Sequence, residues 1–200
     1  MANSGDAPGA QAFTIRLLPS ETAEDSVLMS ELAGLVNEVY EDAEEGLWVE
    51  GAARTSAAEV AGFTKAGEIA IASQDDRLVG CVRVRRLDDD ACELGMLAAV
   101  PSHRGIGIGR ELVRFAEQWA RDCWCSIMQL EVLVPFGWKH PSKEFLDQWY
   151  RRIGYDVTGT GSVAEYYPDL FALLATPCDF RIYRKDIGTG GHVATPEIGD

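Results

Sequence analysis

The hydrophobic period changes near residue 107, and this change restricts the fold more than any other feature of the sequence. Upstream, the segment 78–87 alternates valine with arginine, as in a strand with one buried and one solvated face. Downstream, apolar side chains recur at helical spacing over 107–119, with charged side chains on the opposite stripe. The apolar segment 127–134 then predicts another strand. A strand, a helix and a strand in this order predict a right-handed parallel crossover.

The other elements follow from the same periodicities and from turn residues. Thr22, with Asp25 three residues later, predicts the cap of a first helix. We expect helices after Thr22 and at 56–65, 107–119 and 142–152, and strands at 13–18, 68–73, 78–87, 92–100, 127–134, 155–164 and 180–185. The order β-α-α-β-β-β-α-β-α-β-β predicts an α/β fold (an α+β mixed sheet), in which an antiparallel meander joins a parallel crossover.

Length and composition predict one domain. The chain has 200 residues, of which 46% are apolar and 25% charged, as in a globular domain with a full core. We expect a disordered segment at 1–11, a single domain at 12–186 and a loose tail at 187–200. Neither a secretory signal nor a run of eighteen apolar residues is present, so we expect a cytoplasmic protein without a membrane span.

Charge and metal-ligand residues exclude several function classes. A formal net charge of −14 repels nucleic-acid phosphates, so we expect no nucleic-acid partner. The same charge favours a cationic substrate, although solubility is the ordinary explanation for it. Five cysteines form no CxxC pair, and three histidines lack ligand spacing, so we expect no metal site.

A glycine-rich turn at 104–109 has the chemistry of a phosphate site. Backbone amides at a helix N-terminus lack intrahelical acceptors and carry partial positive charge. Glycines at 105, 107 and 109 remove side chains that would keep a phosphate away, and Arg104 adds a formal charge. The lysine of a P-loop and the third glycine of the dinucleotide fingerprint are both missing. Glycine spacing by itself leaves a simple tight corner as an equal alternative.

Two motifs resemble those of the GNAT superfamily of acetyl-CoA-dependent N-acetyltransferases. Arg104-Gly105-Ile106-Gly107-Ile108-Gly109 is similar to its Arg/Gln-x-x-Gly-x-Gly/Ala motif, and the segment 149–155, Trp-Tyr-Arg-Arg-Ile-Gly-Tyr, resembles its second signature. The resemblance covers 13–185 in element order. It implies a GNAT-like acyl-CoA N-acyltransferase fold, in which a twisted sheet opens beside its fourth strand, and acetyl-CoA as the cosubstrate.

The resemblance also implies which residues hold acetyl-CoA. Backbone groups of the fourth strand would pair with the pantetheine arm, amides of the glycine turn would hold the pyrophosphate, and one of two residues would replace an asparagine that many relatives carry before the second signature. In that order, the residues are Leu97, Ala98 and Ala99; Arg104, Gly105, Ile106, Gly107, Ile108, Gly109 and Arg110; and Ser142 or Lys143.

Three residues are candidates for proton transfer. By resemblance, Tyr150 would protonate the leaving thiolate; the alternative is an aromatic side chain packed in the core. Glu93 and Glu131 are carboxylates within apolar strands, where burial is costly and calls for a reason such as base catalysis. The alternative is a strand carboxylate paired with an arginine such as Arg83 or Arg85. A free amide near Leu97 or Ala98 would polarise the thioester carbonyl, and transfer would be direct.

The acceptor site is predicted from an acidic and aromatic segment after the first helix. It contains Tyr40, Glu41, Glu44, Glu45 and Trp48, which suit a small cationic amine; a solvated helix end is the alternative. Three activities stay open: acetylation of a small-molecule amine, acetylation of a protein N-terminus or lysine, and CoA binding by a regulatory module without turnover. A homodimer is compatible with the family.

Overall fold

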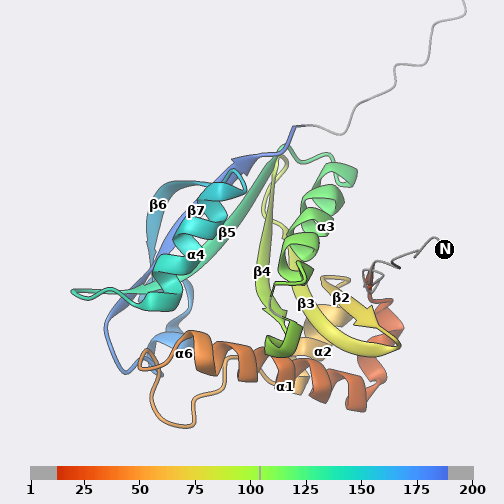
Figure 1. The fold of residues 1–200 in the computed structure, drawn as a ribbon, viewed down its shortest axis with the longest axis horizontal. Helices are drawn as coiled ribbons and strands as arrows, with labels where there is room; N and C mark the ends of the chain where they lie inside the picture. The colour runs from red at the N-terminus through yellow and green to blue at the C-terminus, as the bar shows by residue number, and fades with distance from the viewer. Residues whose placement is uncertain (1–12, 104, 189–200) are drawn as a thin grey trace, which may run out of the picture.

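In the computed structural model, residues 13–103 and 105–188 are described, and they contain one seven-stranded sheet (Figure 1). The strand order is β1-β2-β3-β4-β5-β7-β6, in which only β4 and β5 are parallel. The strands are β1 (Thr14–Leu17), β2 (Ile69–Gln74), β3 (Arg77–Arg86), β4 (Ala91–Ala99), β5 (Ile127–Pro135), β6 (Asp156–Ser162) and β7 (Cys178–Asp186). The mixed sheet, the meander and the parallel crossover predicted from the sequence are confirmed.

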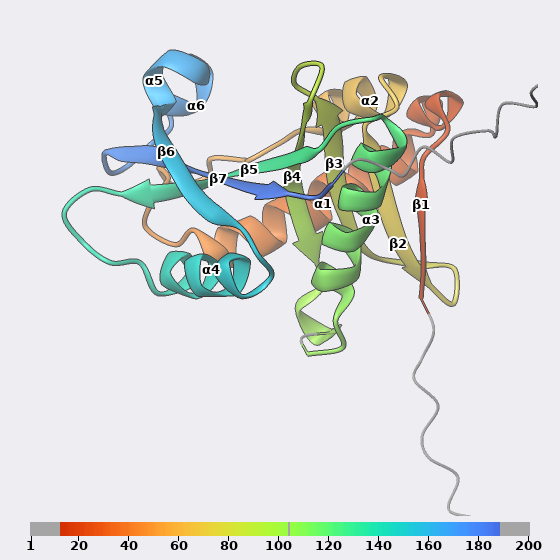
Figure 2. The ribbon, with the colours of Figure 1, turned by 90° about the horizontal axis from the view of Figure 1, so that it is seen from above.

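Helices cover both faces of this sheet (Figure 2). They are α1 (Ser26–Ala43), α2 (Ala57–Lys65), α3 (Ile108–Asp122), α4 (Pro141–Arg152), α5 (Val163–Tyr166) and α6 (Pro168–Phe171), with 3₁₀ turns at Ser20–Glu24 and Pro101–His103. Strand β2 shows how the core divides: Ala70 and Ala72 pack with the α3 cluster, whereas Ile69 and Ile71 pack with α1 and α2. Alternate side chains of a strand point to opposite faces, so each face contributes its own core.

Close packing of α3 on β3 depends on Gly80. A Cβ at this position would lie 2.9 Å from the Ala98 carbonyl oxygen and 3.0–3.1 Å from the side chains of Ile108 and Leu112. The hydrogen atom of glycine therefore allows α3 to approach the sheet with its first turn. This contact fixes the start of α3 relative to β4.

Strands β4 and β5 separate after a short paired segment. They pair in parallel from Ala91 to Glu93 on β4 and from Ile127 to Gln129 on β5. Within the described residues, β4 makes no further pair with β5 beyond this point. The sheet therefore opens between the two strands, as Figure 1 shows to the left of β4.

The structure corrects several details of the predicted elements. Helix α1 is capped by Asp25, whose Oδ1 accepts from the amides of Val27 and Leu28 at 3.1 Å, so the cap predicted at Thr22 is wrong; Thr22 lies in the 3₁₀ turn. The last predicted strand before β7 ends at Ser162 rather than 164, and the short helices α5 and α6, absent from the predicted order, follow it.

Only the first residues of the predicted loose tail lie within the described residues. Ile187 is buried, and its amide donates to the Ser126 carbonyl at 2.8 Å, so the predicted loose tail is wrong at this residue. The predicted disordered segment at 1–11 and the rest of the tail, 189–200, lie outside the described residues. Among helices in the described part of the chain, none is both long and apolar enough to cross a membrane.

Candidate functional site

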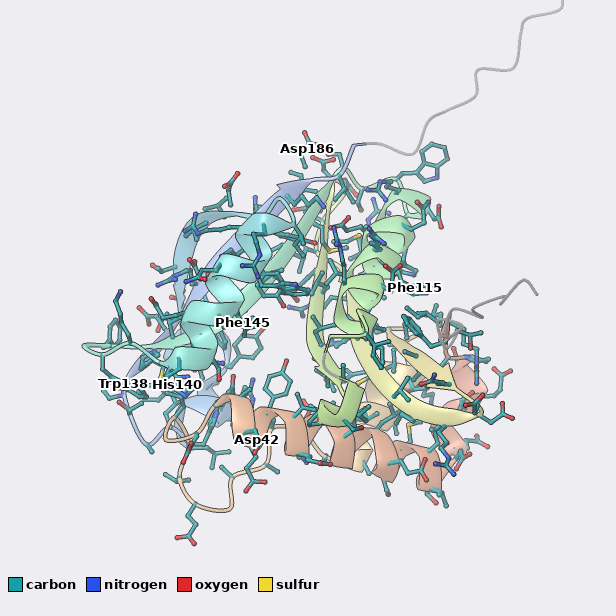
Figure 3. All side chains as sticks on the ribbon, in the orientation of Figure 1. Asp42, Phe115, Trp138, His140, Phe145 and Asp186 are labelled. Atoms are coloured by element: carbon teal, nitrogen blue, oxygen red, sulfur yellow. The ribbon has the colours of Figure 1, made fainter. Side chains whose placement is uncertain are left out.

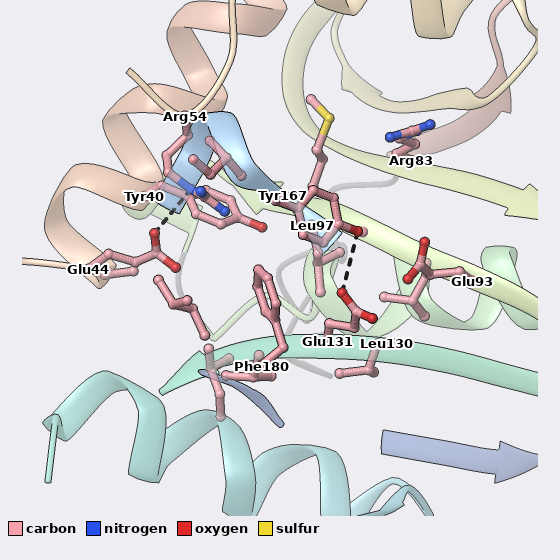
Figure 4. A pocket seen from close by; sticks show the side chains of 18 of the residues that line it. Tyr40, Glu44, Arg54, Arg83, Glu93, Leu97, Leu130, Glu131, Tyr167 and Phe180 are labelled. Atoms are coloured by element: carbon pink, nitrogen blue, oxygen red, sulfur yellow. Dashed lines mark hydrogen bonds and ion pairs between the residues drawn. The ribbon is translucent and has the colours of Figure 1, made fainter. Parts of the chain in front are cut away.

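The opening between β4 and β5 contains a cavity of about 300 Å³. It is lined by β4 from Glu93 to Leu97, by β5 from Leu130 to Leu133, and by side chains of α1, α2, α4, α6, β3 and β7 (Figure 4). Because the strands have diverged, the β4 backbone borders the cavity. A cavity therefore lies beside the fourth strand, where the sequence predicts the cofactor site.

A β-bulge shapes the β4 side of this cavity. The pairing with β3 shifts between Cys81–Ala98 and Arg83–Gly95, so β4 carries one extra residue at this point. Met96 has a φ of 47°, a left-handed conformation that non-glycine residues rarely adopt. The bulge lies one residue before the predicted position near Leu97 or Ala98. Leu97 lines the cavity, whereas the Ala98 side chain is buried in the core with α1 and α2.

The glycine turn leads from β4 into α3, whose first backbone amides have no intrahelical acceptor. Gly105 and Gly107 have φ values of 87° and 99°, and a Cβ at either position would meet no atom within 4 Å. The Glu111 amide donates to the Gly107 carbonyl at 3.0 Å, so the amides before it precede the intrahelical ladder. This arrangement is suited to an anion.

The other predicted members of the turn differ in where their side chains lie. The Ile108 side chain is buried in the α3 core, while Ile106 and Arg110 are exposed. Gly109 lies within the first helical turn. Arg104, the predicted phosphate ligand, lies outside the described residues.

The two predicted carboxylates lie together in the cavity. Glu93 on β4 is buried and forms an ion pair with Arg85, as expected for a strand carboxylate paired with an arginine. Glu131 on β5 accepts from the Tyr167 hydroxyl at 3.4 Å. Burial raises the pKa of the Glu131 carboxyl, and the negative charge of Glu93 raises it further. Glu131 therefore holds a proton at higher pH than an ordinary glutamate.

Tyr150 on α4 lies at the wall of the cavity and is buried. Its ring contacts the rings of Trp149, Tyr155 and Tyr183 at centroid distances of 4.8, 5.8 and 5.8 Å. Burial raises the pKa of its hydroxyl above the ordinary tyrosine value. Tyr150 is thus packed in the core and also borders the cavity, so both of its predicted roles are compatible with its position.

The predicted acceptor segment does not form an acidic wall. Glu44 is buried, and its carboxylate binds Lys143 Nζ at 2.6 Å, Trp48 Nε1 at 2.6 Å and Arg54 Nε at 3.1 Å. Tyr40 lines the cavity, and burial raises the pKa of its hydroxyl. The role predicted for Glu44 as a free carboxylate for a cation is therefore wrong, because two cations of the protein already occupy it.

The other acids of that segment lie elsewhere. Glu41 and Glu45 are exposed and do not line the cavity. The Glu45 backbone carbonyl lies 3.0 Å from His140 Nε2, and His140 caps α4 by accepting from the Ser142 amide at 3.2 Å through Nδ1. Figure 3 shows His140 where the loop that carries Trp138 meets α4. The carboxylates of Glu41 and Glu45 are therefore solvated, as the alternative predicted.

The two residues predicted to replace the missing asparagine differ in their availability. The Lys143 ammonium is buried against Glu44, so it is engaged within the protein. Ser142 is half-buried in the first turn of α4, and its amide is held by His140. A cofactor contact from the Ser142 hydroxyl stays a prediction.

Sequence reasoning missed Arg54 and Tyr167 and gave Arg83 and Arg85 only as ion-pair partners. All four line the cavity. Arg54 lies in the irregular segment between α1 and α2, and Tyr167 lies at the corner between α5 and α6. Neither segment has a periodicity that marks a site, so only the tertiary structure identifies them.

The sequence profile of the Acetyltransferase (GNAT) family matches residues 33–137, just over half of the chain. A search of curated protein sequences gave no significant match. Within the described residues, no group of three or more histidine, cysteine, aspartate or glutamate side chains is arranged to hold a metal ion.

Solved structures share the fold at low sequence identity. An aminoglycoside 6′-N-acetyltransferase complexed with coenzyme A has a TM-score of 0.65 and 18% identity, covering 90% of this chain and 99% of that one. The IAA acetyltransferase from Bacillus cereus has a TM-score of 0.59 and 14% identity, covering 88% and 99%. Ard1 from Thermoplasma volcanium has a TM-score of 0.58 and 14% identity, covering 88% and 97%. The resemblance in fold therefore extends over most of the chain.

Proposed function

Because the chain belongs to the GNAT acetyltransferase family, we propose that it moves the acetyl group of acetyl-CoA directly to the primary amine of a small molecule. The observation that carries this proposal is the opening between β4 and β5. It brings a strand bulge, two carboxylates and a buried tyrosine to one cavity, and β4 leads from that cavity into the glycine turn.

The residues at this opening suit acetyl-CoA, which supplies an acetyl group activated as a thioester. Leu97, Ala98 and Ala99 follow the bulge on a strand that has parted from β5, so their backbone can pair with an amide-containing arm as an added strand does. A Cβ at Gly105, Gly107 or Gly109 would meet no atom within 4 Å, so a pyrophosphate can approach the backbone amides from Gly105 to Arg110. A backbone amide at the Met96–Leu97 bulge would polarise the thioester carbonyl oxygen, and the shifted pairing with β3 at this point supports this role.

Tyr150 is proposed as the general acid. Its raised pKa keeps the proton on Oη at neutral pH, and the thiolate sulfur of the departing CoA can take that proton. A phenol buried among other rings has few rotamers, so its hydroxyl stays directed by packing. Replacing Tyr150 with phenylalanine would therefore remove one proton donor and change little else at this site.

Glu131 is proposed as the general base, with Glu93 next to it. A carboxylate whose pKa is raised toward neutrality accepts a proton from an amine nucleophile more effectively than an ordinary one. Glu93 is held by Arg85, so it sets the charge next to Glu131 rather than moving freely. Glu131 would take the proton directly or through one water molecule.

The acceptor side of the cavity favours a small molecule over a protein segment. Leu170 on α6 and Tyr167 line it, and the hydrogen bond from the Tyr167 hydroxyl to Glu131 links this side of the cavity to β5. A second cavity of about 430 Å³ adjoins the first and shares Arg54, Glu59, Tyr167 and Leu170 with it. Because side chains from both halves of the sheet and from α6 line the first cavity, it suits a compact acceptor better than a long extended chain.

The proposal is tested by free-thiol release from acetyl-CoA with a panel of small primary amines, with the acetylated product identified by mass spectrometry. We expect release to depend on the amine and to yield an N-acetylated product. A chain that binds CoA and releases no thiol with any amine would be a regulatory module instead. Faster release with peptides than with every small amine would move the proposal to a protein substrate.

A further inference from the structure

The arginines that line the cavity differ in how fully the protein compensates their charge. Arg83 binds Glu68 at 2.6 Å and stacks on the Phe63 ring, with Cζ 3.6 Å from the ring centroid. Arg85 is paired with Glu93. Each of these two guanidinium groups therefore has a carboxylate partner that no other cation contacts within the described residues.

Arg54 shares its carboxylate with another cation. Its Nε lies 3.1 Å from Glu44 Oε2, while Glu44 Oε1 binds Lys143 Nζ at 2.6 Å. Trp48 Nε1 donates to Glu44 Oε2 at 2.6 Å, so both carboxylate oxygens are engaged. One negative charge therefore serves two positive charges in this buried cluster.

The donors of Arg54 are also incompletely used. Nη1 is buried and has no hydrogen-bond partner among the described residues, and Nε, although 3.1 Å from Glu44 Oε2, is not aligned for a hydrogen bond to it. A buried donor without an acceptor costs free energy, and the cost is larger for a charged group. The side chain of Arg54 is 17% exposed, and it lines both the main cavity and the adjoining one. An acceptor atom brought by a ligand would relieve this cost.

The protein holds the Arg54 side chain in position. The Asn37 side chain accepts from the amides of Arg54 and Thr55 at 2.8 and 3.1 Å and donates to the Thr55 carbonyl at 3.0 Å. The Arg54 Cζ lies 4.3 Å from the Trp48 ring centroid and 5.3 Å from that of Tyr40. A guanidinium fixed in this way loses little freedom when it binds an anion.

Glu59, another carboxylate in the lining of both cavities, does not neutralise the Arg54 charge. Glu59 is exposed, and its Oε2 accepts from the Thr55 hydroxyl at 2.8 Å. In the described part of the chain, Glu59 forms no ion pair with Arg54. Figure 4 shows Arg54 and Glu44 at one side of the cavity and Glu93 and Glu131 at the other.

Building on the proposed function, we propose that Arg54 binds a carboxylate of the acceptor, so that the acceptor is an amine with a carboxylate at its far end. The amine would lie on the side of Glu131, where a base is available, and the carboxylate on the side of Arg54. The two oxygens of a carboxylate match the fork of a guanidinium, and this charge-assisted contact is stronger than a neutral hydrogen bond. The substrate class is thus an ω-amino acid or a similar zwitterion, in place of the purely cationic amine expected from the sequence.

The test compares two series of acceptors with the unmodified chain. One series contains straight-chain ω-amino acids of increasing length, and the other contains n-alkylamines of the same lengths without the carboxylate. We expect kcat/KM for the best amino acid to exceed that for its matched alkylamine by about tenfold to a hundredfold, as for a hydrogen bond to a charged group. An optimum in chain length is also expected, because the two ends bind at fixed positions.

Variants then assign the preference to Arg54. In Arg54→Gln the ratio of kcat/KM between the two series should fall close to one, whereas Arg54→Lys should keep part of it. The matched control, Arg16→Gln, removes an exposed arginine on β1 and should keep the ratio. Thermal unfolding of each variant checks that the fold is intact, and the ratio in the unmodified chain decides the question if Arg54→Gln does not fold.

Two outcomes would overturn the assignment of Arg54 to the acceptor carboxylate, and a third would overturn the proposed acetyltransferase function. Equal kcat/KM for amino acids and alkylamines in the unmodified chain would show that no carboxylate is bound. A preference that survives Arg54→Gln would place the carboxylate elsewhere. Thiol release with neither series, although CoA binds, would contradict the proposed function itself and the role of Arg54 with it.

Discussion

The start of α3 allows a prediction in which two identical substitutions have opposite effects. Gly107 is the N-cap with a φ of 99°, whereas Gly109 lies two residues later inside the helix. A Cβ at either position would meet no atom within 4 Å, so collision with neighbours does not contribute. The left-handed conformation costs a non-glycine residue roughly 1–2 kcal/mol, while alanine is preferred to glycine inside a helix by roughly 0.5–1 kcal/mol.

Gly107→Ala should therefore destabilise the protein, and Gly109→Ala should stabilise it slightly, with a difference of about 1.5–3 kcal/mol between the two. For a chain of this size each kcal/mol corresponds to roughly 2–4 °C in Tm, so calorimetric unfolding resolves the pair. The substitution at Gly109 controls for the methyl group itself. Equal shifts for the two variants, or a gain in Tm for Gly107→Ala, would refute the left-handed start of the helix.

Three further predictions concern groups that line the cavity. Because burial raises the pKa of Glu131, the folded chain holds the Glu131 proton more tightly than the unfolded chain does. The stability that this proton contributes is lost as the pH rises through the raised pKa. Glu131→Gln should therefore increase the free energy of unfolding at neutral pH and remove this pH dependence, as measured by denaturant titrations at several pH values. Glu44→Gln should cost roughly 3–5 kcal/mol because it leaves Lys143 and Arg54 without their shared carboxylate, and adding Lys143→Met should recover part of the loss. An equal loss in the single and double variants, measured by denaturant titration, would contradict the buried pair. Tyr150→Phe should lower kcat about a hundredfold while calorimetry shows unchanged CoA affinity, and an unchanged kcat would leave Tyr150 a packing residue.

The sequence predicted the sheet and the main helices because burial leaves a periodic pattern. Alternation in β3 and the apolar stripe of α3 each reflect one buried face, and both were confirmed. The first helix cap was misplaced because Thr22 and Asp25 are both good caps, and the 3₁₀ turn at Ser20–Glu24 decides between them. Helices α5 and α6 have four residues each, which is too short for any period to show.

The sequence predicted those site residues whose burial is energetically costly within their own segment. Glu93 and Glu131 stood out as carboxylates in apolar strands, and the structure brings both to one cavity. The state of Glu44 had no such signal, because its partner Lys143 lies 99 residues away in the chain. Contacts of this range depend on how α1 meets α4, which local pattern does not encode.

CoA binding where β4 leads into α3 is the property on which the proposed function depends, and titration calorimetry with CoA tests it most directly. The informative variant is Gly109→Glu, with Gly109→Gln as a control of the same shape. An acidic residue in the first helical turn favours the helix, so Gly109→Glu should fold at least as stably as Gly109→Gln. We predict that CoA binds the unmodified chain, and that Gly109→Glu weakens binding at least about tenfold more than Gly109→Gln through repulsion of the phosphates. Equal CoA affinity in the two variants, or no CoA binding by the unmodified chain, would contradict the account.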